Sequence, residues 1–162
     1  MTVNESAGSL PHLTAAGEAR MVDVGGKDAA AREAVASGRL VLNAAAVAAL
    51  RTGTVAKGDA LGVARVAGIM ATKRVPDLIP LCHQVALSGV DVGLEVRDTE
   101  VVITVTARTT DRTGVEMEAL TGVAVAGLAL HDMVKALDPA AVLTDIRLEV
   151  KTGGKSGTWT RP

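Results

Sequence analysis

The absence of phenylalanine and tyrosine limits what kind of core this chain can build. Trp159 is its one tryptophan, although 48% of the 162 residues are hydrophobic. The core must therefore consist of Val, Leu, Ile, Met and Ala, which bury less area per side chain than aromatic rings do. A compact fold then needs close backbone packing or contacts between subunits. Because residues 1–11 are small, polar and turn-prone, we predict that they form a flexible leader. The length suits one core, so we predict a single oligomeric domain, residues 12–162.

Charge and cysteine content exclude several classes of protein. Seventeen Lys and Arg oppose 18 Asp and Glu, so the net charge of −1 is not that of a nucleic-acid binder. The single cysteine, Cys82, rules out an internal disulfide and fits a reducing compartment. No signal peptide is recognisable, and the longest markedly apolar run, Ala119–Leu130, is too short to span a bilayer. We predict a cytoplasmic protein that binds neither nucleic acid nor membrane.

Hydrophobic periodicity and capping residues predict the helices and strands. Helices are expected at Asp28–Ser37, from the capping residue Asn43 through Leu50, at Asp59–Arg74 and at Val115–Leu137. Strands are expected at Glu18–Val24, Arg39–Leu42, Val90–Val96, Val101–Arg108 and Thr144–Lys151. Pro76 is expected to end the third helix. In the last strand, Ile146, Leu148 and Val150 alternate with polar residues, which places them on one buried face.

The order of these elements predicts an α+β fold. Two of the strands are joined by the short turn at residues 97–99, which indicates a hairpin. We therefore expect a mainly antiparallel sheet with helices packed on one face. Small apolar residues on nearly every side of the long helix, residues 115–137, indicate burial on more than one side, with a neighbouring subunit as the second wall.

Three segments place basic residues where they can bind an anion. Lys57–Asp59 precedes a helix, whose N-terminal N–H groups favour anions. Lys73 and Arg74 are followed by Leu81–His83, a combination suited to binding phosphate and moving protons. Lys155 lies in the run GGKSG, whose glycines let the backbone wrap around an anion. Each segment also has a structural interpretation: a solvated turn, a helix end followed by a core histidine, and a mobile tail.

The long helix carries charged residues at both ends. Asp132 and Lys135 near its end are neighbours on the helix surface, either as an exposed ion pair or as a carboxylate that tunes the proton transfer of a lysine. Glu118 near its start is fourteen residues from Asp132, so the two differ by about 40° around the axis but lie roughly 21 Å apart along it. One small substrate cannot touch both within a subunit. A site that both line must therefore be built from two subunits.

Four runs of the sequence resemble segments of one known family. They are HLTAAGEARMVDVGGK from His12, KGDALGVARVAGIMATKRVPDLIPLCH, TGVEMEALTGVAVAGLALHDMVKAL and IRLEVKTGGKSG. In this order they resemble the molybdenum-cofactor biosynthesis protein C family, the cyclic pyranopterin monophosphate synthases, over nearly the whole chain beyond the leader. The resemblance implies a ferredoxin-like α+β subunit assembled as a hexamer, a trimer of dimers, with active sites at subunit interfaces.

The resemblance also implies a reaction. A lyase of this family rearranges 3′,8-cyclo-7,8-dihydroguanosine 5′-triphosphate to cyclic pyranopterin monophosphate and releases diphosphate. Opening one ring of the purine and closing another requires repeated proton transfers, which Lys, Asp and His side chains can perform. No redox cofactor is expected. Mg²⁺ would accompany the triphosphate, but no spacing in the sequence predicts a dedicated metal site.

Roles for individual residues follow from the same resemblance. Lys57 and Lys135 match the catalytic lysines of the family, and Asp132 matches its active-site aspartate. We add His83 as a fourth catalytic candidate, because imidazole transfers protons near neutral pH. The expected substrate-binding residues are Leu81, Cys82, His83, Glu116, Met117 and Glu118, with Lys73, Arg74 and Lys155 for the triphosphate.

Three positions depart from the family pattern. Gln84 follows His83 where a proline is usual, His131 stands in place of a tyrosine, and Val134 in place of a cysteine. No proposed catalytic group is lost, although His131 beside Asp132 is expected to change the pH optimum. The alternative is a non-catalytic paralogue, acting as an oligomeric scaffold or a pterin- or nucleotide-binding protein. A GTP-binding regulator is disfavoured because the chain has no phosphate-binding loop.

Overall fold

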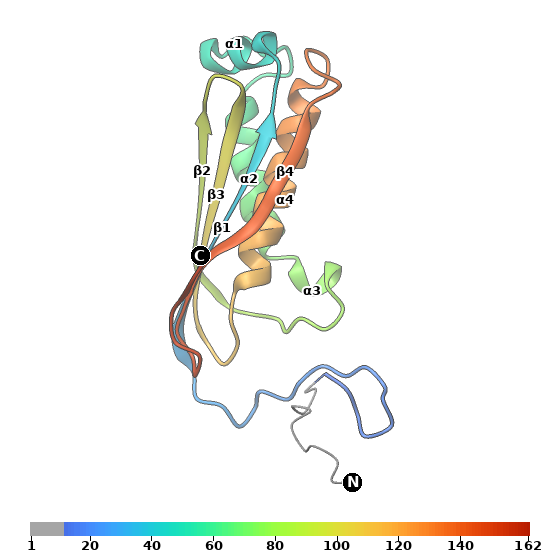
Figure 1. Ribbon diagram of the computed structural model, residues 1–162, viewed down its shortest axis with the longest axis vertical. Helices are drawn as coiled ribbons and strands as arrows, with labels where there is room; N and C mark the ends of the chain where they lie inside the picture. The colour runs from blue at the N-terminus through green and yellow to red at the C-terminus, as the bar shows by residue number, and fades with distance from the viewer. Residues whose placement is uncertain (1–11) are drawn as a thin grey trace.

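The computed structural model describes residues 12–162, so the predicted leader, residues 1–11, lies outside the described residues. The strands are β1 Ala30–Val41, β2 Leu87–Val96, β3 Glu100–Asp111, β4 Val142–Thr152 and β5 Trp159–Thr160. The helices are α1 Ala44–Thr52, α2 Ala60–Thr72, α3 Val75–Leu78 and α4 Glu116–Val134. Figure 1 shows the long strands and the two long helices lying along one common direction.

The five strands form one antiparallel sheet in the order β2-β3-β1-β4-β5. Helix α4 packs against β1, β3 and β4, while α2 packs against β2 and along α4. Figure 1 shows both helices on the same side of the sheet. The predicted α+β class, with helices on one face of the sheet, is confirmed, and the sequence of elements is that of a ferredoxin-like fold with additional short helices.

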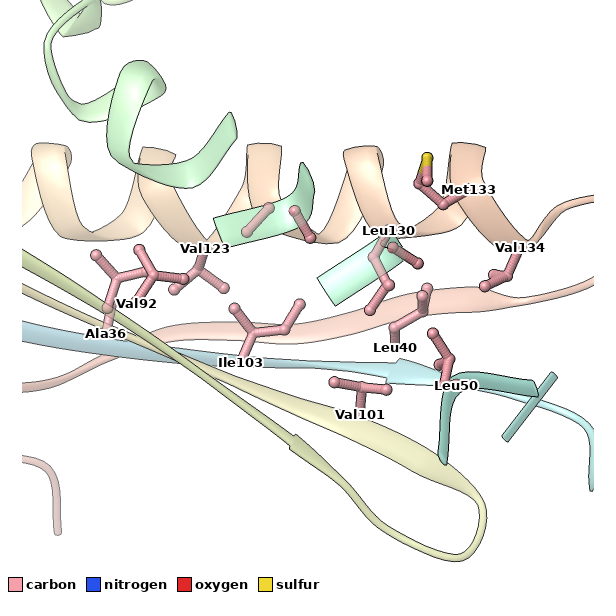
Figure 2. Close-up of a cluster of buried hydrophobic side chains, with 14 of the residues drawn as sticks. Ala36, Leu40, Leu50, Val92, Val101, Ile103, Val123, Leu130, Met133 and Val134 are labelled. Atoms are coloured by element: carbon pink, nitrogen blue, oxygen red, sulfur yellow. The ribbon is translucent and has the colours of Figure 1, made fainter. Parts of the chain in front are cut away.

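The core lies between α4 and the sheet and is built from aliphatic side chains. Figure 2 shows Val123 and Leu130 of α4 pointing toward Leu40 and Ile103 of the sheet, and all four are 0% exposed. Glycines bring the layers close together: a Cβ atom added at Gly38 would lie 2.6 Å from Val123 Cγ1. Close backbone packing therefore compensates for the missing aromatic rings, as the composition predicted.

The helix predicted at Asp28–Ser37 is wrong, because these residues form the first part of β1. Ala34 and Ala36 have high helix propensity, but both are 0% exposed on the side of β1 that faces the helices. Strand β1 lies at the centre of the sheet and pairs with β3 and β4 on its two edges. Backbone pairing on both edges outweighs the local preference of alanine.

The strand predicted at Glu18–Val24 is also wrong. Within residues 12–29 the structure shows one isolated bridge, Leu13–Ala19, and otherwise turns and irregular backbone. This segment leads into β1 and carries side chains to the site described below. The strand predicted at Arg39–Leu42 is the end of β1 rather than a separate element.

Strand β4 does not alternate as predicted. Leu148 pairs with Ala36 and Val150 pairs with Val35, with a register shift between the two pairs. Consecutive residues of β1 point to opposite faces, so Leu148 and Val150 lie on opposite faces of the sheet. A second shift lies near Asp145, whose φ of 53° is in the left-handed region. The prediction that Ile146, Leu148 and Val150 share one face is therefore wrong. A strict alternation in the sequence cannot reveal these register shifts.

The predicted helix starts are confirmed by their caps. The Asn43 side chain accepts a hydrogen bond from the backbone N–H of Ala46 at 2.9 Å, and Gly53 ends α1 with a φ of 67°. The Asp59 side chain accepts from the N–H of Gly62 at 2.8 Å at the start of α2. Both helices therefore begin where the sequence indicated.

The two other helices differ from expectation in detail. Helix α2 ends at Thr72, and Pro76 does not end it but lies in the first turn of the short α3. Helix α4 has 19 residues and, by length and composition alone, is long and apolar enough to cross a membrane. However, 56% of its apolar window is buried inside the protein, so α4 is the core helix of a soluble domain.

Candidate functional site

Two lysines and one aspartate meet where α2 begins and α4 ends. Lys57 lies in the turn before α2, while Asp132 is in the last turn of α4 and Lys135 directly follows that helix. Lys57 Nζ donates to Asp132 Oδ2 at 2.8 Å and to the Asp132 backbone carbonyl at 2.7 Å. Lys135 Nζ lies 2.7 Å from Asp132 Oδ1. We call these three residues the lysine cluster.

The carboxylate of the lysine cluster is held in its charged form. Hydrogen bonds from Lys135 and then from Lys57 lower the pKa of Asp132 from 3.8 to about 2. The side chains of Lys57, Asp132 and Lys135 are 43%, 57% and 55% exposed in the single chain. The cluster therefore lies on the surface of the single chain, and its three side chains are held together by hydrogen bonds and ion pairs.

The low pKa of Asp132 predicts a measurable titration. Since the folded pKa lies below 3.8, the ion pairs stabilise the fold above that pH, and their contribution is lost as the pH falls through about 2. We expect Lys135→Ala to raise the pKa of Asp132 more than Lys57→Ala does, measured by NMR titration of the side-chain carboxyl. Arg51→Ala, at a separate surface ion pair with Asp98, should leave it unchanged. An unchanged pKa in both lysine variants would contradict this assignment.

A cavity of about 340 Å³ lies at the other end of α4. Three parts of the chain line it: the irregular segment before β1, the loop after α3, and the start of α4. The lining residues are His12, Val22, Val24, Lys27, Leu81, Cys82, His83, Val85, Thr113, Gly114, Glu116, Met117 and Glu118. The six residues predicted to contact the substrate from the LCH and EME runs are thus brought together, and we call this space the α4 pocket.

The imidazole of His83 connects two walls of the α4 pocket. His83 Nε2 lies 2.6 Å from the backbone carbonyl of Val22. Because a carbonyl only accepts, Nε2 carries the proton and donates this bond. Arg112 Nε donates to the carbonyl of Lys27 at 2.8 Å. Both bonds hold the segment before β1 against the pocket.

A buried carboxyl forms part of the α4 pocket. Glu118 is 4% exposed, and burial raises its pKa above 4.5. Burial also raises the pKa of the Cys82 thiol, with a further contribution from the charge of Glu118. Glu116 lies at the rim, with an oxygen 3.7 Å from Lys151 Nζ of β4. The pocket therefore combines an imidazole, a thiol and a carboxyl that is partly desolvated.

The three residues predicted for the triphosphate are not gathered in one place. Lys73 lines a smaller hollow of about 260 Å³, together with Gln84 and Glu118. Arg74 is exposed, 3.5 Å from Asp77, and lines neither hollow. Lys155 is exposed in the turn after β4 and also lines neither. In the described chain, Lys73 alone of the three lies beside the α4 pocket.

One chain thus holds two candidate sites, the lysine cluster and the α4 pocket, at opposite ends of α4. The lysine cluster contains three of the four predicted catalytic residues, whereas His83 lies in the α4 pocket with Glu118. Both Glu118 and Asp132 belong to the same continuous helix, so the separation of roughly 21 Å stands.

Sequence reasoning missed three polar residues of the α4 pocket: His12, Lys27 and Thr113. Lys27 follows a pair of glycines, as Lys155 does. This shared pattern could have indicated Lys27 as a second anion-binding candidate. Thr113 directly precedes the glycine before α4. No pattern indicated His12, because its role depends on where an irregular segment lies.

Comparison with known proteins identifies the family of this chain. A model of the MoaC family matches residues 21–154, which is most of the chain and includes the lysine cluster and every lining residue of the α4 pocket except His12. The chain belongs to the MoaC family. A protein of Nocardioides sp. is 61% identical over 163 residues, covering 99% of this chain and 100% of that protein, and is called cyclic pyranopterin monophosphate synthase.

Other relatives bear the same name. The protein of Streptomyces coelicolor is 62% identical over 152 residues, covering 94% of this chain and 89% of its own length. That of Peptoclostridium acidaminophilum is 49% identical over 150 residues, covering 93% and 96%. Membership of the MoaC family makes this chain a cyclic pyranopterin monophosphate synthase, a lyase of molybdenum cofactor biosynthesis.

Proposed function

We propose that this chain converts 3′,8-cyclo-7,8-dihydroguanosine 5′-triphosphate to cyclic pyranopterin monophosphate and diphosphate, with the lysine cluster as its catalytic group. The observation that carries this proposal is the position of the Asp132 carboxylate, 2.8 Å from Lys57 Nζ and 2.7 Å from Lys135 Nζ. Two ammonium groups held by one ionised carboxylate offer protons at fixed positions. The rearrangement needs this property because it opens one ring and closes another through repeated proton transfers.

The same cations suit the phosphate chemistry. Attack of a sugar hydroxyl on the α-phosphorus forms the cyclic phosphate and breaks the bond to diphosphate. Negative charge then develops on the leaving group, and lysine side chains stabilise it. We assign Lys73, Arg74 and Lys155 to the triphosphate, with Lys73 supported by its place beside Glu118 in the smaller hollow. Mg²⁺ would accompany the triphosphate as part of the substrate.

We assign substrate binding to the α4 pocket. Leu81, Cys82 and Met117 provide its apolar surface, while His83, Glu116 and Glu118 provide polar groups. With a raised pKa, Glu118 remains protonated to higher pH and can donate a hydrogen bond to a ring nitrogen or carbonyl of the substrate. His83 can take part in proton transfer through Nδ1 while Nε2 is bonded to Val22.

The separation of the lysine cluster from the α4 pocket along α4 supports an oligomeric enzyme. We propose a hexamer, a trimer of dimers of the single domain at residues 12–162, that acts in the cytoplasm with each site at a subunit interface. In this arrangement the lysine cluster of one subunit meets the α4 pocket of another, and the exposed lysine cluster becomes shielded from water.

The experiment that tests this function is a direct assay of the purified protein. The cyclised GTP derivative is added, and diphosphate and the fluorescent oxidised pterin are measured. We expect both products in equal amounts with the wild type. An assembled oligomer that binds substrate but forms neither product, beside an active control enzyme, would instead support the non-catalytic scaffold.

A further inference from the structure

A buried carboxyl group near the lysine cluster has no role in the proposed reaction. Asp138, three residues after Lys135, is 6% exposed. Its Oδ2 accepts a hydrogen bond from the backbone N–H of Asn43 at 2.7 Å, and its Oδ1 accepts from the N–H of Ala140 at 3.2 Å. Burying a carboxylate costs free energy unless hydrogen bonds compensate. Both oxygens of Asp138 are bonded, so this side chain is suited to hold two segments of backbone together.

Asn43 strengthens this connection with its side chain. It lies between β1 and α1, and its Oδ1 caps α1 by accepting from the N–H of Ala46 at 2.9 Å. Its Nδ2 donates to the backbone carbonyl of Leu137 at 2.9 Å. One residue thus starts α1 and also binds the turn that follows α4. We call the two bonds that join Asn43 to Leu137 and to Asp138 the clamp.

The turn held by the clamp carries Lys135. The N–H groups of Leu137 and Asp138 both donate to the carbonyl of Val134, at 2.8 and 3.0 Å. Val134 is the last residue of α4 and is 0% exposed. The backbone of Lys135 therefore lies between a buried helix end and the two residues that the clamp holds.

The other end of α1 leads to Lys57. Gly53 ends the helix, and Val55, 7% exposed, belongs to the hydrophobic core. The N–H of Gly58 donates to the carbonyl of Val55 at 2.9 Å, with a φ of 100° at Gly58, which closes the turn around Lys57. The nine residues of α1 therefore connect the clamp to this turn. Figure 1 shows α1 at the end of the molecule where α4 ends.

We propose that Asn43 and Asp138 are positioning residues of the lysine cluster. Their clamp holds the turn of Lys135 to the helix that leads to the turn of Lys57. This inference rests on the proposed catalytic role of the cluster. Exposed ion pairs hold long side chains weakly, and a misplacement of about 1 Å in a reacting group can cost on the order of 100-fold in rate. Hydrogen bonds to the backbone supply the rigidity that exposed ion pairs lack.

Replacing Asn43 by serine separates the clamp from the helix cap. Serine caps helices about as well as asparagine, but it offers no amide N–H to the carbonyl of Leu137. We expect Asn43→Ser to fold and to lower kcat at least ~5-fold because the lysines are misplaced. The KM should stay unchanged, since the α4 pocket lies at the other end of α4. Ala48→Gly, at an exposed position of α1, weakens the helix without touching the clamp and should keep the wild-type kcat.

Two replacements of Asp138 test the other half of the clamp. Asp138→Ala removes both acceptor oxygens and leaves the N–H of Asn43 without its partner, whereas Asp138→Asn keeps one acceptor. Per folded oligomer, we expect kcat to fall at least ~10-fold in Asp138→Ala and to be partly restored in Asp138→Asn. If Asp138→Ala does not fold, Asn43→Ser and Asp138→Asn decide the question.

A titration of Asp132 by NMR reports on the lysine cluster without measuring activity. The hydrogen bond from Lys135 is the largest cause of its low pKa of about 2, so displacement of Lys135 should let that pKa rise toward 3.8. We expect this rise in Asn43→Ser and in Asp138→Asn, and no change in Ala48→Gly. A clamp that merely stabilised the fold would leave the pKa of Asp132 unchanged in every folded variant.

Two results would overturn the proposal. The first is a wild-type kcat with an unchanged Asp132 pKa in folded Asn43→Ser and Asp138→Asn. The second is an equal loss of kcat in Asn43→Ser and Ala48→Gly, because the stability of α1 would then be the cause. An inactive wild type whose Asp132 pKa still rises in Asn43→Ser would refute the proposed function and leave the positioning by the clamp standing.

Discussion

Turnover should fall at least ~100-fold when Lys57 is replaced by alanine, because a positioned proton donor is lost from the reaction. Lys57 Nζ makes its two hydrogen bonds to Asp132, so its loss also frees one oxygen of that carboxylate. The side chain is 43% exposed, and we therefore expect the fold and the oligomer to remain intact. Initial rates of diphosphate release, with size-exclusion chromatography of each variant, measure both effects. Lys135→Ala should behave in the same way.

Two controls make this result specific. Arg51→Ala removes another exposed cation, whose ion pair with Asp98 is 2.8 Å long, and should leave the rate unchanged. Lys57→Arg keeps the charge but replaces a group that can exchange its proton with one that stays protonated, so its rate should remain low. Wild-type rates in both Lys57→Ala and Lys135→Ala would remove the lysine cluster from the mechanism.

Gly38→Ala should destabilise the fold by about 1–3 kcal/mol, as expected for a methyl group forced into a packed core. The added Cβ atom would lie 2.6 Å from Val123 Cγ1 and 3.3 Å from Ile146 Cγ1. Strand β1 cannot move away easily, because β3 and β4 pair with its two edges. Urea unfolding of the wild type and the variant measures the change as a shift in the transition midpoint.

Gly93 provides a matched control in the same sheet. It lies in β2 on the face away from the helices, and an added Cβ atom would meet its nearest neighbours, both in Thr104, at 3.8 and 3.9 Å. Gly93→Ala should therefore leave stability unchanged or raise it by up to about 1 kcal/mol, because alanine restricts the unfolded chain. Equal losses in both variants would show that close packing at Gly38 is not the cause.

The candidate site was predictable where it depends on helical spacing. Asp132 and Lys135 are three residues apart, so their contact follows from helix geometry, as does the distance from Glu118. The contact made by Lys57, the third member of the lysine cluster, could not be predicted from spacing. Lys57 is 75 residues from Asp132, and nothing in its turn indicates which helix end it meets. The family resemblance named Lys57 as a candidate, but the hydrogen bonds became visible only in the fold.

Some residues of the α4 pocket were also predicted from the sequence, whereas others became visible only in the structure. The runs that contain His83 and Glu118 were predicted to contact the substrate, and the structure places the two runs together. His12 and Lys27 were not identified, because they belong to a segment predicted partly as a strand. That segment is held by bonds such as the one from His83 to the carbonyl of Val22. Backbone carbonyls carry no residue-specific pattern, so sequence reasoning has no means of detecting such a bond.

What the sequence determined by itself is local or compositional. Helix caps at Asn43 and Asp59, the strands flanking the turn at residues 97–99 and a core of close-packed aliphatic residues all follow from nearby residue types. The tertiary structure alone decided that the alanine-rich start of β1 is a strand and that β4 changes face between Leu148 and Val150. The reason is physical: each of these choices is made by hydrogen bonds to strands distant in sequence, whose free energy exceeds the local preference of the residues involved.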